Sequence, residues 1–68
     1  MIQRTKMTVY YPDNTEDIFI SRPYDTDKLD YADGLTSMGY FIELDDNSRI
    51  YCMPTLVKRI KIEKIREA

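Results

Sequence analysis

Residues 39–65, GYFIELDDNSRIYCMPTLVKRIKIEKI, decide the fold of this chain. Apolar side chains recur at every second position of residues 40–44, which is the period of a strand with one face turned to a core. Short polar residues follow at 45–48, and their side chains hydrogen-bond nearby backbone groups, which favours a turn. Residues 49–53 alternate again. The pattern therefore predicts a β-hairpin over residues 40–53.

The chain after this hairpin is predicted to bend at Pro54 and then to form a further strand. Proline lacks the backbone N–H that a strand ladder needs, so Pro54 should end the return strand. Residues 56–65 fit either a strand or a helix. Ile60 and Ile62 alternate with charged residues, which favours a strand, and β-branched side chains lower helix propensity. We predict a strand over residues 57–63.

A hairpin, a proline-led corner and a closing strand resemble the end of the Src-homology-three-like and Sm-like small barrels. The matching residues are Met-Pro-Thr-Leu-Val at 53–57, followed by Ile60 and Ile62, so the resemblance covers the last third of the chain. It implies a single turn of tight helix between the last two strands. The proline-ligand groove of the signalling domains requires Trp, which this chain lacks, and the Sm RNA-binding motifs are not visible. Neither function is therefore expected here.

The first third of the chain predicts a second hairpin. Residues 5–11 alternate and are rich in strand-forming residues, residues 12–15 read Pro-Asp-Asn-Thr and favour a turn, and residues 18–20 form a short apolar run. Residues 23–39 are predicted to be a loop with at most one helical turn. We therefore expect one all-β domain over residues 1–68, with about five antiparallel strands in a small barrel or a twisted sheet.

The alternating apolar positions give a predicted core. These positions are Met7, Val9, Tyr11, Ile18, Ile20, Leu35, Tyr40, Ile42, Leu44, Ile50, Cys52, Leu56, Val57, Ile60 and Ile62.

Size and composition limit how such a core can be stabilised. A single core in a chain of 68 residues supplies roughly 3–5 kcal/mol, and small domains commonly add disulfides, a metal or a partner chain. One cysteine and no histidine leave no internal disulfide and no Cys/His zinc site. We therefore expect a homo-oligomer. No apolar run is long enough for a signal sequence or a membrane span, so we expect a cytoplasmic protein without membrane contact.

The composition argues against catalysis. Without histidine, the Ser–His and Cys–His arrangements are unavailable, and the two isolated glycines form no phosphate-binding loop. Four aspartates lie within residues 25–33, but Leu29 interrupts the calcium-loop pattern, and solvated loop acids are the better interpretation. We expect no enzymatic activity, no metal and no cofactor.

Charge is divided along the chain, and the acidic part carries the first functional hypothesis. Residues 13–46 have a net charge of −8, whereas residues 1–12 have +2 and residues 47–68 have +4. An acidic face bearing tyrosines would dock on the basic surface of a nucleic-acid-binding protein. In size and style the chain resembles small acidic inhibitors encoded by phages or mobile elements. The predicted partner-binding residues are Tyr24, Asp25, Asp27, Asp30, Tyr31 and Asp33.

The basic part of the chain carries the alternatives. One is an oligomeric protein that binds a small ligand or nucleotide at its subunit junctions, and another is a structural assembly subunit. Direct binding of single-stranded nucleic acid is not expected, because the pI is about 4.9 and such binders are usually basic. The predicted anion-binding residues are Arg49, Lys58, Arg59 and Lys61.

Overall fold

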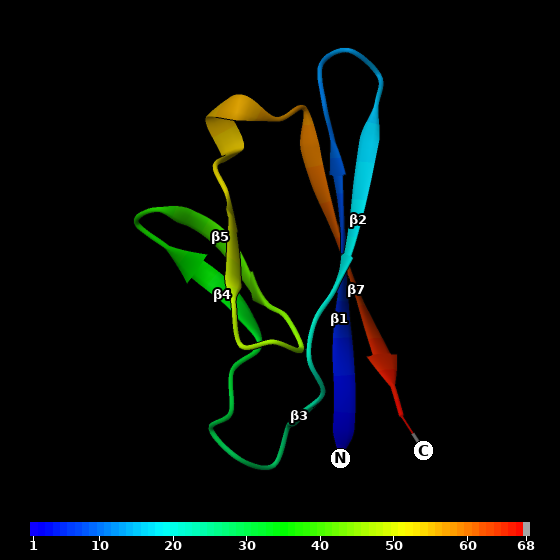
Figure 1. Ribbon diagram of the computed structural model, residues 1–68, viewed down its shortest axis with the longest axis vertical. Coiled ribbons are helices and arrows are strands. Elements are labelled where there is room, and N and C mark those ends of the chain that lie inside the picture. Colours follow the sequence, from blue (N-terminus) through cyan, green and yellow to red (C-terminus); the bar gives the residue numbers. More distant parts are fainter. Residues whose placement is uncertain (68) are drawn as a thin grey trace.

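The strand β1 (Ile2–Tyr10) lies at the centre of the first of two antiparallel sheets (Figure 1). On one side it pairs with β2 (Glu16–Ile20) and with the short strand β3 (Tyr24–Asp25). On the other side it pairs along most of its length with β7 (Arg59–Arg66). These bounds come from a computed structural model that describes residues 1–67.

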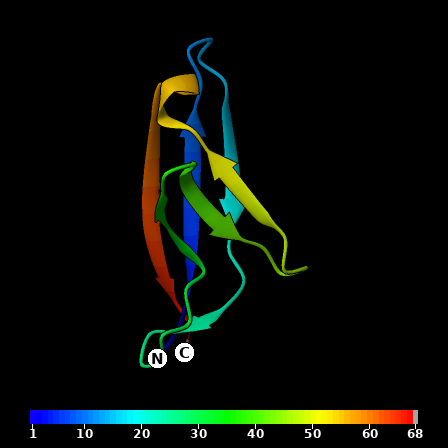
Figure 2. The same cartoon turned by 90° about the vertical axis from the view of Figure 1, so that its left-hand side faces the viewer.

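The second sheet has the strand order β4, β5, β6 and packs across the first, as Figure 2 shows from the side. Its strands are β4 (Asp33–Thr36), β5 (Gly39–Glu43) and β6 (Arg49–Cys52). The predicted hairpin over residues 40–53 is thus confirmed as β5 and β6. The proline-led turn is also confirmed, since the 3-10 turn η1 (Pro54–Leu56) connects β6 to β7.

Two turns of the same design close the two predicted hairpins. Residues 13–15 read Asp-Asn-Thr and residues 46–48 read Asp-Asn-Ser. In each turn the aspartate accepts hydrogen bonds from both the backbone N–H and the hydroxyl two residues later. The asparagines adopt the left-handed conformation, with φ of 69° at Asn14 and 65° at Asn47. Asparagine reaches this conformation more readily than most residues, which explains its place in both turns.

The core lies between the two sheets. Met7 and Val9 of β1 pack against Ile42 of β5 and Cys52 of β6, all four buried. A ring of partly buried side chains surrounds them: Tyr11, Phe19, Tyr40, Leu44, Ile50, Val57, Ile60 and Ile62. Eleven of the fifteen predicted core positions are therefore confirmed, and Phe19 was not predicted.

Four predicted core residues are wrong, because Ile18, Ile20, Leu35 and Leu56 are exposed. On β2 the error is one of phase: Phe19 lies opposite the core residue Met7, so its two isoleucine neighbours must face the other way. Leu35 and Leu56 lie on the second sheet's edge and on η1, where nothing within residues 1–67 covers them.

The prediction that residues 23–39 form a loop is wrong in part, because β3 and β4 lie within this stretch and only residues 26–32 between them form a loop. Both strands are short and are held by their neighbours β1 and β5. Of the two predicted architectures, the small barrel is not found, since the strands of residues 1–67 form two sheets without a closed barrel. None of these residues belongs to a helix long and apolar enough to cross a membrane.

Candidate functional site

A polar cluster between the sheets holds two of the predicted docking residues beneath the surface. Lys64 of β7 donates hydrogen bonds to Asp33 at 2.9 Å, to the hydroxyl of Tyr24 at 3.2 Å and to that of Thr5 at 3.1 Å. Thr5 and Tyr40 also donate to the Asp33 carboxylate. Tyr24 is only 8% exposed, as is the side chain of Asp33. These two residues therefore stabilise the fold, and the little of them that stays exposed faces a hollow of about 320 Å³.

The ionisation of this cluster follows from its hydrogen bonds. Burial alone would raise the pKa of Asp33, but the hydrogen bonds from Tyr40, Lys64 and Thr5 together hold that pKa below its ordinary value. Burial also lowers the pKa of Lys64, and its contacts with Asp33 and Tyr24 more than reverse this, leaving the pKa raised. The pair is therefore charged at neutral pH.

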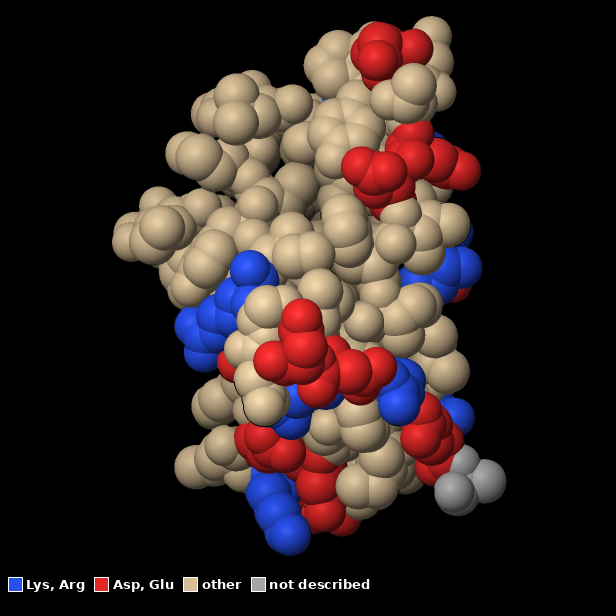
Figure 3. Space-filling view, viewed as in Figure 1, with Lys and Arg blue, Asp and Glu red and all other residues tan. Residues whose placement is uncertain are grey.

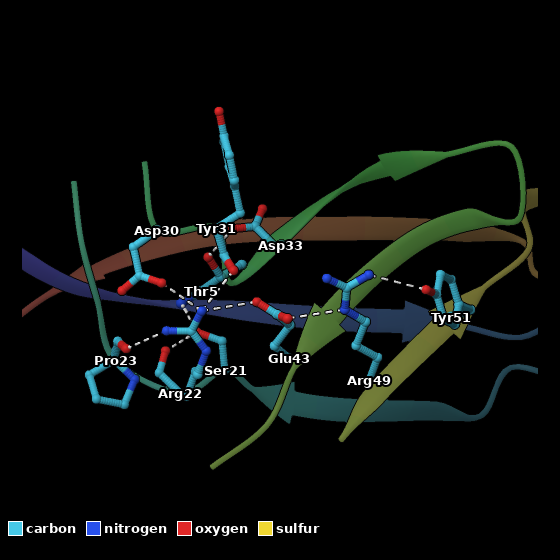
Figure 4. A network of polar contacts seen from close by, with 10 residues as sticks. All are labelled: Thr5, Ser21, Arg22, Pro23, Asp30, Tyr31, Asp33, Glu43, Arg49 and Tyr51. Atoms are coloured by element: carbon cyan, nitrogen blue, oxygen red, sulfur yellow. Dashed lines mark hydrogen bonds and ion pairs between the residues drawn. The ribbon is translucent and has the colours of Figure 1, made fainter. Parts of the chain in front are cut away.

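Arg22 joins three segments into a second network, drawn in Figure 4. Its Nη2 donates to Asp30 at 2.8 Å, to the Tyr31 carbonyl oxygen at 2.9 Å and to Glu43 at 3.0 Å. Glu43 in turn accepts from Arg49 Nε at 3.0 Å. The hydrogen bond from Arg22 lowers the pKa of Asp30. The negative charge of Asp30 is thus already balanced by Arg22 within the chain.

The remaining predicted docking residues are at or near the surface. Asp25 and Asp27 accept hydrogen bonds from the amino group of Met1 at 3.0 and 2.7 Å. Tyr31 is 64% exposed. A hollow of about 320 Å³ lies beside them, lined by both acidic and basic side chains, among them Asp30 and Lys64. The stretch keeps exposed groups for docking, but all four of its carboxylates already face a cation.

Of the four carboxylates that form no ion pair within residues 1–67, three lie at the tip of the β1–β2 hairpin and the fourth, Asp46, lies in the turn between β5 and β6. Within residues 1–67, Asp13, Glu16 and Asp17 form no ion pair. Asp13 accepts only from Thr15, and Asp17 accepts from the hydroxyl of Tyr11 at 2.9 Å. We call Asp13, Glu16 and Asp17 the acidic tip. The sequence signal for it was the acidic run between the first two predicted strands.

An uncharged surface lies beside the second sheet's outer end. Figure 3 shows there, at the upper left, an area free of Lys, Arg, Asp and Glu, with acidic atoms over the β1–β2 hairpin at the upper right. β4, the β4–β5 turn and the η1 segment carry large apolar side chains that are widely exposed: Leu35 75%, Met38 60%, Met53 48% and Leu56 68%. Figures 1 and 2 both place the β4–β5 turn next to η1. We call these four residues the apolar end. Sequence reasoning missed this surface, because it assigned two of the four to the core.

The predicted anion-binding residues fall into separate places. Arg49 lies over the Phe41 ring at 4.5 Å and bonds Glu43, and Lys61 lies 3.8 Å from Glu63. Lys58 and Arg59 line one hollow of about 250 Å³ together with Tyr10, Tyr11, Asn14 and Thr15. The structure thus brings two of the four together.

The potential metal ligands of residues 1–67 are dispersed, and the cysteine is buried. Residues 1–67 contain no group of three or more Cys, Asp or Glu side chains placed to hold a metal ion. Cys52 is buried, and burial raises the pKa of its thiol, which lowers the fraction of reactive thiolate.

No protein-family description matches this chain, and comparisons with curated proteins and with solved structures likewise find no match.

Proposed function

We propose that this protein is a non-enzymatic protein-binding module that docks through its apolar end. The observation that carries the proposal is the exposure of four large apolar side chains, each about half exposed or more, on an uncharged surface. The segments that carry these side chains lie at one end of the molecule (Figures 1 and 2), and large exposed apolar surface on a soluble protein commonly marks a binding site. Two of the four are methionines, whose flexible thioether side chains adapt to a partner's shape.

The acidic tip supports a partner with a basic surface. Its three carboxylates lack cations within residues 1–67 and lie along one side of the apolar end (Figure 3). An interface with an apolar centre and a charged rim favours a partner of opposite rim charge. The occupant is therefore a protein whose apolar contact patch is bordered by Lys and Arg.

Nucleic-acid-binding proteins have basic surfaces of this kind, so we propose that the partner is one of them. The resemblance in size and acidity to small inhibitors encoded by phages or mobile elements favours the same partner. The η1 turn supports the likeness to Src-homology-three-like and Sm-like domains at this corner of the fold. That likeness gives no reason to expect proline-rich or RNA ligands here.

The test compares three forms of the protein as bait in one host lysate. In the first variant Leu35→Asp and Leu56→Asp place charges in the apolar end. In the matched control Leu29→Asp places a charge on a side chain that is 89% exposed at the other end of the molecule. We expect one basic protein to be retained by the wild type and by the control, but not by the double variant. Hydrogen exchange of that complex should show protection at residues 35–38 and 53–57.

Two outcomes would overturn the proposal. Equal retention by all three baits would remove the apolar end from binding. Light scattering could also show that the wild type is a dimer and the double variant a monomer, and the occupant would then be a second copy of the chain. Retention of the partner should also weaken at high salt, since exposed ion pairs are screened by salt. If the double variant loses the partner but salt does not change its retention by the wild type, the acidic tip has no role in binding.

A further inference from the structure

The hollow between the β1–β2 turn and the start of β7 is built from two segments far apart in sequence. The backbone N–H of Lys58 donates to the Tyr10 carbonyl oxygen at 2.7 Å, which holds the chain after η1 against the end of β1. The turn closes the hollow through hydrogen bonds from Asn14 to Tyr11 and from Tyr11 to Thr15, at 3.0 and 2.9 Å. The hollow is therefore part of the folded framework.

The charges in this hollow have one sign. Its six lining residues include two cations, Lys58 and Arg59, and no carboxylate. Within residues 1–67 neither cation has a carboxylate oxygen within 4.0 Å, and neither side chain makes a hydrogen bond to the protein. Two adjacent cations without counter-charge attract an anion in a chain whose net charge is −2.

Arg59 is held ready for such an anion. Its guanidinium lies 4.3 Å from the centre of the Tyr10 ring, a cation–π contact that fixes the plane of the group. Its N–H edge stays free to donate, and a planar guanidinium matches two oxygens of a phosphate at once. Lys58 adds a second, flexible donor beside it.

We infer that this hollow binds the phosphate group of a small phosphate monoester. Its volume of about 250 Å³ lies below the range of roughly 300–1,000 Å³ in which drug-sized ligands are enclosed, so it suits a phosphate and the first atoms of its carrier. Thr15 and Asn14 supply further polar atoms at the rim. Glu16 lies on the same outer face of the sheet as Arg59. Both are opposite Tyr10, Glu16 on the neighbouring strand β2 and Arg59 on the neighbouring strand β7. The negative charge of Glu16 opposes binding of the anion.

The test is a titration of the isotopically labelled protein followed by NMR. The probes are inorganic phosphate, adenosine monophosphate and adenosine. We expect both phosphate-bearing probes, and not adenosine, to shift the Arg59 Nε signal and the amides of residues 10–15 in a saturable way. Tighter binding of the monophosphate than of inorganic phosphate identifies an ester. The reverse order would leave only free inorganic phosphate and overturn the ester assignment.

Charge-matched variants separate a site from diffuse attraction. Lys58→Gln with Arg59→Gln should raise the Kd for adenosine monophosphate about tenfold or more, the loss expected on removing strong charged contacts. The control Lys6→Gln with Arg66→Gln removes two other cations that form no ion pair within residues 1–67 and should leave Kd nearly unchanged. Glu16→Gln should lower Kd. An equal loss of affinity in the control variant would overturn the site, and so would the absence of saturable NMR shifts in the wild type. If the double variant failed to fold, Lys58→Gln alone, at an exposed position, would decide.

Discussion

At the residue scale, the two asparagines of the Asp-Asn-Thr and Asp-Asn-Ser turns show that turns defined by local hydrogen bonds can be predicted from the sequence. Both stretches were predicted as turns from residue type alone, and both are turns, with Asn14 and Asn47 left-handed. Local hydrogen bonds that each aspartate accepts define these turns, so no distant residue was needed to predict them.

Substitutions at Asn47 should separate backbone strain from side-chain contacts. Asn47→Ala is expected to lower the free energy of unfolding by about 1–2 kcal/mol, the cost of a left-handed conformation for a residue with a Cβ. Asn47→Gly should change it by less than about 0.5 kcal/mol, because glycine reaches φ of 65° without strain. Urea unfolding measures both. Equal losses for alanine and glycine would contradict the strain argument.

The burial of Tyr24 and Asp33, in contrast, could not be predicted from neighbouring residues. An aspartate in an acidic stretch suggests a solvated group, yet Asp33 pairs with Lys64, which lies 31 positions later in the chain. Only the pairing of β1 with β7 brings Lys64 to this place. Functional hypotheses built on charge runs therefore fail when a distant strand supplies the counter-charge.

Asp33 gives the protein an acid-dependent stability. Its pKa in the folded state lies below the ordinary value of 3.8, so its contribution is present above about pH 4 and is lost as pH falls through the folded-state pKa. Asp33→Asn should lower the free energy of unfolding at pH 7 by about 1–3 kcal/mol and flatten its dependence on acid pH. Unfolding curves measured from pH 7 down to acid test this.

The control for that experiment is Glu16→Gln, which removes an exposed carboxylate that forms no ion pair within residues 1–67. It should leave the stability at pH 7 within about 0.5 kcal/mol of the wild type. An unchanged acid dependence in Asp33→Asn would show that other carboxylates set it.

At the element scale, β2 illustrates where periodicity stops being informative. The run Ile18-Phe19-Ile20 is apolar throughout, so alternation cannot say which face is buried. The register with β1 decides it, because Phe19 lies opposite Met7. The strands β3 and β4 went unrecognised for a related reason: they are short, and pairing with β1 and β5 makes strands of residues that have little strand preference of their own.

Alanine substitutions on β2 should reproduce this phase. Phe19→Ala is expected to cost about 2 kcal/mol or more, since the ring packs against the core. Ile18→Ala, at a side chain that is 53% exposed, should cost less than about 1 kcal/mol. The comparison needs only thermal or urea unfolding of the two variants. A larger loss at Ile18 would mean that the strand faces the other way.

The two glycines of the second sheet should respond differently to an added methyl group. Gly39 has φ of +109°, and a Cβ there would lie 2.6 Å from the Cys52 carbonyl oxygen. Gly39→Ala should therefore cost about 2 kcal/mol or more, because backbone must move. At Gly34 the Cβ would meet the edge of the Phe41 ring at 2.9 Å, and a side chain shifts more easily. Gly34→Ala should cost less by the same unfolding measurement, and the reverse order would contradict this.

At the scale of the whole molecule, the residues that are exposed say as much as those that are buried. Within residues 1–67 the buried core cluster has four members, Met7, Val9, Ile42 and Cys52, whereas large apolar side chains remain on the surface at the apolar end. The sequence predicted the all-β class and most of the core. It could not show that the sheets leave one end uncovered, since that depends on how strands distant in the chain pair.

A small core predicts marginal stability for the isolated chain. We expect a free energy of unfolding of roughly 3–5 kcal/mol, the range of single cores at this size. The melting temperature should be independent of protein concentration if the isolated chain is a monomer. A melting temperature that rises with concentration would show that copies of the chain stabilise one another, in agreement with the homo-oligomer expected from the sequence.

The pairing of β1 with β7 also sets the order in which the molecule can form. Its residue pairs are 49 to 63 positions apart in the chain, from Tyr10 with Arg59 to Gln3 with Arg66. The β4–β5–β6 sheet needs only neighbouring segments. Loop closure over so long a stretch is entropically costly and slows folding, so the second sheet should nucleate and β7 should dock last. During synthesis on the ribosome, β1 can pair with β2 and β3 early, but its other edge stays unpaired until β7 emerges.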